Sequence, residues 1–127
     1  MKVGIIRCQQ TEDLCPGTGD FAAVEKKSGA FETLGDCTIV GFVSCGGCPG
    51  SKAIARAQAL MDRGAQAIAL ATCITKGNPD GFPCPNRDSS FRRCGRNARR
   101  FPYWNTRTEV FRFPKNGFSP SKAACFQ

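Results

Sequence analysis

Short apolar runs alternate with helical segments through the first 85 residues, and this alternation limits the fold more than any other feature. Apolar runs rich in Val, Ile and Ala predict buried strands at residues 2–7, 37–44 and 66–72. Helices are predicted at residues 21–31, with Asp20 as the N-cap, and at residues 51–63, with Gly64 after the end. Strands separated by single helices pair in parallel through right-handed crossovers. We therefore expect a small layered α/β domain with a parallel sheet of three or more strands, flavodoxin-like or a fragment of that fold.

The chain has nine Cys and no His among its 127 residues. Its N-terminus carries one short apolar run, too brief for a signal peptide, and no run approaches the roughly 20 residues of a membrane helix. These features predict a cytoplasmic protein without a membrane partner, where cysteines more often bind metal or do redox work than form disulfides. The lack of His excludes every Cys/His zinc site and every His-dependent catalytic triad.

Most of the cysteines fall where the predicted strands end. The carboxyl ends of parallel strands meet at one edge of the sheet, and function gathers outside that edge in open α/β sheets. The topology places six thiols there: Cys8, Cys15, Cys45, Cys48, Cys73 and Cys84. Cys37 begins a strand and is expected at the opposite edge. For Cys37, Cys94 and Cys125 we expect ordinary small, buried side chains.

Cys45-Gly-Gly-Cys48 lies between a predicted strand and a helix N-terminus, where free N–H groups favour a thiolate. Together with the other thiols at this edge, the pair predicts a metal site, most simply zinc held by four thiolates. Two alternatives stay open. Four thiolates also suit an iron–sulfur cluster, and without metal the pair would be a redox dithiol in which Cys45 attacks. Inert burial of all six thiols is the weaker interpretation.

Two weaker features concern anions. Gly17-Thr18-Gly19-Asp20 precedes a predicted helix but lacks a full phosphate-loop pattern, so we expect a turn and a helix cap there. Arg7 and Lys76 could face a thiolate or an anionic substrate. Each is expected instead to be a surface charge.

Four stretches of the chain resemble the CGGC domain family: RCQQTEDLCPGTGDF, GFVSCGGCPG, RGAQAIALATC and KGNPDGFPCP. The resemblance covers residues 1–85 and implies a small α/β metal-binding domain, usually suggested to hold zinc, with no assigned reaction. It implies the same six cysteines as the functional ones. Family members typically continue with Cys-Pro-His after the Gly-Phe-Pro run and end a last strand near Gly-Thr-His. In this chain Asn86 stands at the position of that first His.

Residues 86–127 differ sharply in composition from residues 1–85. They hold ten Lys and Arg against two acidic residues, and eight of the twelve aromatic residues, whereas residues 1–85 are neutral. They show no helical or strand periodicity, so we expect a poorly ordered tail. Arg with interleaved aromatic residues suits nucleic-acid binding, but a frameshift near codons 85–87 explains the change better.

The genetic code permits this frameshift. Codons for Arg99 to Thr106, read one base later, allow Val-Val-Phe-Leu-Ile-Gly-Thr-His, a buried strand with the family's ending, and Trp104 forces the Gly. We therefore predict an α/β domain at residues 1–85 and a basic, poorly ordered or out-of-frame segment at residues 86–127. Loss of the last helix–strand unit would leave a sheet edge unpaired, which makes a dimer plausible.

Overall fold

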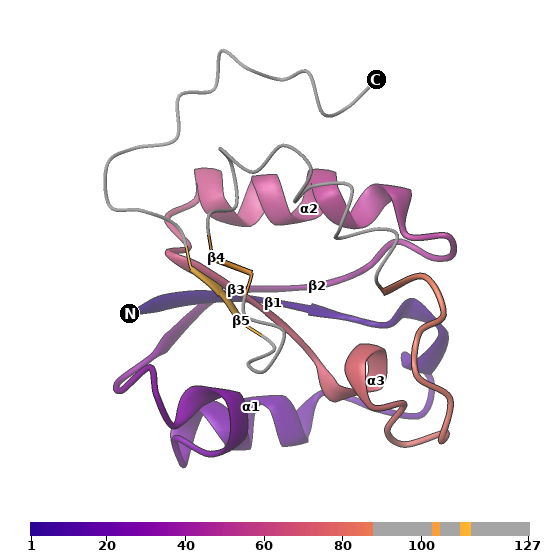
Figure 1. The fold of residues 1–127 in the computed structure, drawn as a ribbon, viewed down its shortest axis with the longest axis horizontal. Coiled ribbons are helices and arrows are strands. Elements are labelled where there is room, and N and C mark those ends of the chain that lie inside the picture. The colour runs from indigo at the N-terminus through magenta and orange to yellow at the C-terminus, as the bar shows by residue number, and fades with distance from the viewer. Residues whose placement is uncertain (88–102, 105–109, 113–127) are drawn as a thin grey trace.

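The structure, a computed structural model, describes residues 1–87, 103–104 and 110–112 (Figure 1). In these ranges the strands are β1 (Lys2–Arg7), β2 (Thr38–Ser44), β3 (Ala67–Leu70), β4 (Tyr103–Trp104) and β5 (Val110–Arg112). The helices are α1 (Thr18–Glu25), α2 (Ser51–Asp62) and α3 (Thr72–Thr75), with 3₁₀ turns η1 (Gln9–Thr11) and η2 (Gly29–Phe31).

The strands form one open sheet in the order β2-β1-β3-β5-β4. Strand β1 lies in the middle of a parallel trio and pairs with β2 on one side and β3 on the other. This confirms the predicted α/β class, and the order β2-β1-β3 is the one with which flavodoxin-like sheets begin. From β1 the chain continues to β2 on one side of β1 and then crosses to β3 on the other side. The direction of the strand order reverses here, so the carboxyl ends of β1 and β3 flank the topological switch point.

The far side of β3 pairs with β5, which runs antiparallel to it, and β5 pairs with β4. Ile68 of β3 lies opposite Phe111 of β5 in this register. The sequence analysis expected a sheet edge left unpaired by the loss of the last strand; β3, the last of the predicted strands, is instead paired within the chain. Strands of two or three residues are too short to show a period-two pattern, so neither was predicted. The expected lack of order in residues 86–127 otherwise falls outside the described residues.

Helices α1 and α2 cover opposite faces of the sheet (Figure 1). On the α2 face, Gly4 of β1 and Gly41 of β2 leave room for Leu60, which is 5% exposed. A Cβ atom on Gly4 would lie 2.8 Å from Leu60 Cδ1 and 3.0 Å from Leu60 Cβ. The helix therefore packs directly on the strand backbones, which fixes the distance between this layer and the sheet.

Two predicted elements, the first helix and the third strand, have other boundaries in the structure. Helix α1 begins at Thr18, because Gly17 adopts a left-handed conformation (φ 82°) as its N-cap and accepts the N–H groups of Asp20 and Phe21. Asp20 therefore lies in the first turn and is not the N-cap. The same helix ends at Glu25, ahead of Lys27, which also has a positive φ (53°). A left-handed residue breaks the helical hydrogen-bond pattern, so residues 21–31 do not form one helix.

The second of these elements is β3. This strand ends at Leu70, and Cys73 lies inside the short helix α3 instead of directly after a strand.

A helix needs roughly 20 apolar residues to cross a membrane. Helix α2 has 12 residues, and none of the helices in the described ranges could span a bilayer.

Candidate functional site

Three of the predicted cysteines meet at the switch point. The backbone N–H of Cys8, directly after β1, points to the sulfur of Cys73 with an N···S distance of 3.1 Å. The next N–H along the chain, that of Gln9, lies 3.5 Å from the sulfur of Cys45. These contacts join the loops after β1 and β2 to α3, because each loop leaves its strand at the same edge.

A small pocket gathers a second, overlapping set of thiols. Its volume is about 20 Å³, and four cysteines line it: Cys8, Cys45, Cys48 and Cys84. Cys84 is held there by its backbone N–H, which donates to the carbonyl of Ile74 at 2.9 Å. Ala53 of α2 and Pro49 form part of the remaining wall, so the pocket lies on the α2 face.

The other cysteines lie elsewhere. Cys15 is half-buried in the loop before α1, where its N–H donates to the Thr11 carbonyl at 2.9 Å, and it does not line this pocket. Cys37 directly precedes β2, at the opposite edge of the sheet as expected, and is half-buried where a buried side chain was expected. Cys94 and Cys125 lie outside the described residues. The structure therefore brings five of the six predicted thiols to one corner of the molecule.

The Cys45–Cys48 turn depends on its glycines. Gly46 and Gly47 have φ values of 82° and 97°, and Gly50, the N-cap of α2, has 87°. Residues other than glycine rarely adopt this left-handed backbone conformation. The turn leaves Cys48 exposed and Cys45 half-buried.

Basic side chains surround the turn, and the sequence analysis missed them. The Arg56 guanidinium donates to the Ser44 hydroxyl at 2.6 Å and to the Ser44 carbonyl at 3.1 Å, directly before Cys45. Arg87 also lines the thiol pocket and donates to the Thr75 carbonyl at 3.0 Å. The signal for Arg56 was available, because Lys52 and Arg56 are four residues apart on one face of α2.

Burial raises the pKa of the Cys8 thiol above its ordinary value of 9.0. The backbone N–H of Gln10 acts in the opposite direction, while the neighbouring sulfurs of Cys45 and Cys73 raise the pKa further. Cys8 is therefore a neutral thiol at physiological pH in this arrangement. A cation among these sulfurs would reverse that balance, because it favours the thiolate.

Arg7 is buried, with 7% of its surface exposed, so the expectation of a surface charge was wrong. Its guanidinium carbon lies 5.8 Å from the centre of the Phe42 ring, a cation–π distance. The Nε and Nη2 atoms have no hydrogen-bond partner in the part of the chain that the structure describes. Lys76 is exposed, as expected.

In the described ranges, no three Cys, Asp or Glu side chains are arranged so that they could hold a metal ion. The donor types nevertheless suit one, because thiolates are preferred ligands of zinc and of iron–sulfur clusters. A bound ion would therefore require the thiol side chains to turn toward one point.

The fold and this corner define a cysteine-rich α/β protein whose CxxC turn lies at the carboxyl edge of a parallel sheet. The sequence profile of the CGGC domain matches residues 2–99, and the chain belongs to the CGGC domain family. This confirms the resemblance of residues 1–85 and extends it to residue 99.

One curated relative is the uncharacterized protein MJ0582 of Methanocaldococcus jannaschii. It is 44% identical to the chain over 79 residues, which are 58% of this chain and 62% of the relative. The match therefore spans less than two thirds of that protein's length. No solved structure matches the chain significantly.

Proposed function

We propose that the protein binds zinc through cysteine thiolates at the carboxyl edge of its parallel sheet. The observation that carries this proposal is that thiols from three separate loops line one pocket: Cys8, Cys45, Cys48 and Cys84. Four thiolates are a complete ligand set for tetrahedral zinc. Membership of the CGGC domain family supports metal binding in general.

The four cysteine side chains of this pocket must rotate before they can hold an ion, because no three Cys, Asp or Glu side chains in the described ranges are arranged to do so. Cys48 has that freedom, because it is exposed on a turn whose glycines adopt left-handed conformations. Two further cysteines remain candidate ligands. The sulfur of Cys73 accepts the backbone N–H of Cys8, and Cys15 lies in the loop before α1. Metal sites of small domains rarely exist fully formed without the ion, so binding is coupled to reorganisation.

Zinc in this position would cross-link the loops after β1, β2 and α3, and would stabilise the fold. Arg56 and Arg87 would offset part of the negative charge that four thiolates bring. Catalytic zinc sites usually include an imidazole ligand. A chain without His therefore favours a structural or sensory site over a hydrolytic one.

The test is the metal content and visible spectrum of protein purified without oxygen. Wild-type protein and Cys37→Ser, which changes a thiol at the opposite edge, should hold about one zinc per chain. The double variant Cys45→Ser/Cys48→Ser should hold none. Iron with broad visible absorption would indicate an iron–sulfur cluster in place of zinc. The absence of metal from wild-type protein would refute the metal proposal.

A dithiol redox function is the second candidate, favoured by the pairing of an exposed Cys48 with a half-buried Cys45 on one turn. Cys48 is the more exposed of the two, so we propose it as the attacking thiol in place of Cys45, which the sequence suggested. The Cys48 thiolate would attack a substrate disulfide and release one substrate thiolate. Cys45 would then attack Cys48 and release the other, leaving a Cys45–Cys48 disulfide.

This candidate is separable from metal binding. Metal-free protein treated with oxidised and then reduced glutathione should form and lose the Cys45–Cys48 disulfide, as differential alkylation and mass spectrometry would report. A thiol pair that stays reduced under oxidised glutathione would contradict it.

Free thiols throughout the described residues are consistent with the cytoplasmic location that we also propose.

We further propose that residues 86–127 are read out of frame. Their composition changes abruptly at Pro85 and a shifted reading permits the family's ending, whereas the family match up to residue 99 argues against a shift before that residue. Sequencing the gene and its transcript tests this directly. An open shifted frame that encodes an apolar strand and then Gly-Thr-His is expected. A stop codon in that frame between codons 87 and 106 would refute the proposal.

A further inference from the structure

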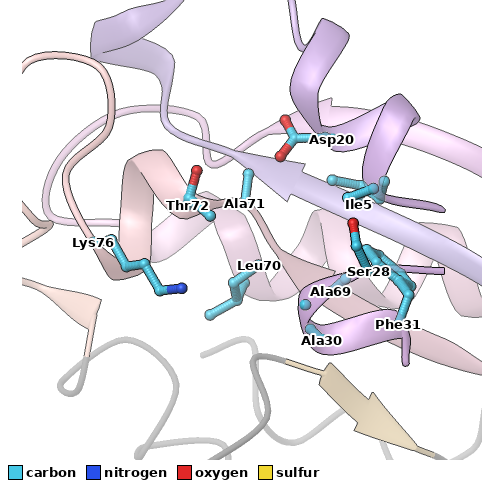
Figure 2. Close-up of a pocket in the computed structure, with 12 residues that line it drawn as sticks. Ile5, Asp20, Ser28, Ala30, Phe31, Ala69, Leu70, Ala71, Thr72 and Lys76 are labelled. Carbon is cyan, nitrogen blue, oxygen red and sulfur yellow. The ribbon is translucent and has the colours of Figure 1, made fainter. Parts of the chain in front are cut away.

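A second pocket lies on the other face of the sheet, beside the carboxyl ends of β1 and β3. Its volume is about 100 Å³, and it opens between α1, η2 and α3 (Figure 2). Ile5 and Ala69, on adjacent parallel strands, form its floor, and Ala23 and Phe31 form the wall on the α1 side. Open α/β sheets bind small molecules at this position, next to the switch point.

The apolar floor carries polar groups at its rim. Ser28 and Thr72 contribute hydroxyl groups, and the two charged lining residues have opposite signs. Asp20 comes from the first turn of α1, while Lys76 follows α3, so the acid and the base enter from different elements (Figure 2). A mainly apolar pocket with a few polar groups is the usual form of a small-molecule site.

The charges restrict what this pocket can hold. A ligand with only a carboxylate can pair with Lys76 but gains no attraction from Asp20, and a ligand with only an ammonium can pair with Asp20 but gains none from Lys76. Each ion pair adds to binding, so a ligand with both charges gains more than a ligand with either charge alone. A molecule with both charges can direct its ammonium to Asp20 and its carboxylate to Lys76.

The volume restricts the size. An apolar cavity of about 150 Å³ holds benzene, so roughly 100 Å³ accommodates a smaller apolar group with its polar atoms at the open rim. We propose that this pocket binds a small zwitterionic α-amino acid, of the size of alanine or serine. Asp20 recognises the ammonium group, Lys76 recognises the carboxylate, and the side chain contacts Ile5 and Ala69.

This site is independent of the thiol site. The thiol pocket is lined by Ala53 of α2, whereas the amino-acid pocket is lined by Ala23 of α1, and these helices cover opposite faces of the sheet. The variant Cys45→Ser/Cys48→Ser should therefore bind the amino acid as wild-type protein does. Failure of the metal proposal would leave this inference intact, and the converse also holds.

The experiment titrates the full chain with L-alanine and follows binding by calorimetry. Two probes each lack one charge: propionate lacks the ammonium group, and ethylamine lacks the carboxylate. Wild-type protein should bind alanine at least about tenfold more tightly than either probe, since each charged hydrogen bond contributes about one to two decades of affinity. Equal binding of alanine and one of the probes would overturn the proposal.

Two variants assign the charges. Asp20→Asn should remove the preference for alanine over propionate, and Lys76→Met should remove the preference for alanine over ethylamine. Their matched controls, Glu25→Gln on α1 and Lys52→Met on α2, should keep both preferences. Retention of both preferences in Asp20→Asn and Lys76→Met would also overturn the proposal.

A measurement on wild-type protein keeps the test valid if a variant fails to fold. Addition of alanine should shift the backbone amide resonances of Ala23, Ala69 and Thr72, and leave those of the Cys45–Cys48 turn unchanged. Shifts confined to other parts of the chain, or no saturable shift, would place the amino acid elsewhere or exclude its binding.

Discussion

The two faces of the parallel sheet lead to the same carboxyl edge but are packed differently. On the α2 face, Leu60 lies against the backbone of Gly4 and Gly41, and the pocket at the edge has room for about one water molecule. On the α1 face, the pocket at the edge has about five times that volume and carries charged groups. The fold thus places two chemically different pockets at one edge and separates them by the thickness of a sheet.

The difference follows from the residues of β1. Neighbouring residues of a strand point to opposite faces. Gly4 therefore faces α2 without a side chain, which lets that helix approach, whereas Ile5 and Arg7 face the other layer with long side chains. A close-packed face should tolerate neither lost nor added atoms, while the open face should accept added ones.

Loss of atoms from the close-packed face should have the largest effect. Leu60→Ala should lower the free energy of unfolding by about 2–5 kcal/mol, because Leu60 is 5% exposed and its loss leaves a cavity. Leu14→Ala is the matched control, since Leu14 is 66% exposed and its loss should change stability by less than about 0.5 kcal/mol. Urea unfolding measures both. Similar values for the two variants would show that α2 is not packed closely on the sheet.

Addition of a single carbon should distinguish the faces. In Gly4→Ala the new Cβ would lie 2.8 Å from Leu60 Cδ1 and 3.0 Å from Leu60 Cβ, so Leu60 must shift and stability should fall by about 1–3 kcal/mol. Ala23→Leu adds more atoms on the α1 face, where the pocket can receive them, and should change stability by less than about 1 kcal/mol. It should also block the pocket to alanine.

A second glycine controls for the loss of glycine itself. A Cβ atom added to Gly19, on α1, would meet no other group within 4 Å, so Gly19→Ala should stabilise the helix by roughly 0.5–1 kcal/mol. Equal losses in Gly4→Ala and Gly19→Ala would indicate a backbone effect and not a packing effect.

Removal of the buried charge tests the α1 face in another way. Arg7→Met keeps most of the length of the side chain and removes a guanidinium whose Nε and Nη2 lack partners among the described residues. We expect stability to rise by about 1 kcal/mol, since desolvation of the charge exceeds the lost contact with Phe42. Arg63→Met, an exposed control, should have no effect beyond about 0.5 kcal/mol. A clear loss of stability in Arg7→Met would mean that the charge has a stabilising partner.

The sequence predicted the central elements well because their periodicity is strong. Strands β1 and β2 and helix α2 were predicted to within one residue at each end. Helix α1 was misplaced because Gly17 and Lys27 adopt left-handed conformations that local pattern does not specify. Strands β4 and β5 could not be predicted, since the pairing of β5 with β3 and of β4 with β5 depends on tertiary structure.

The candidate site was predictable as far as topology determines it. Parallel strands bring Cys8, Cys45 and Cys73 to one edge whatever their side chains do. The positions of the arginines near the turn, and the pocket with Asp20 and Lys76, depend on how the helices pack. This packing cannot be derived from the sequence pattern. Burial of Arg7 could have been inferred, because alternation places it on the same face as Ile5, inside the layer.

The smallest expected effect concerns protonation on the thiol side. Because the pKa of Cys8 is raised, its thiolate should appear at higher pH in folded protein than in urea-unfolded protein, where its ordinary value of 9.0 applies. The pH midpoint of its alkylation rate, followed by mass spectrometry in metal-free protein, measures this displacement.

The neighbouring sulfurs provide the control. Cys45→Ser/Cys73→Ser removes two groups that raise the Cys8 pKa, so the midpoint should move back toward the unfolded value but not reach it, because burial, the largest cause, remains. A folded midpoint at or below the unfolded one would contradict the neutral thiol. It would mean that positive charge outweighs burial at this edge, and the thiol side would then resemble the charged α1 side more than the packing suggests.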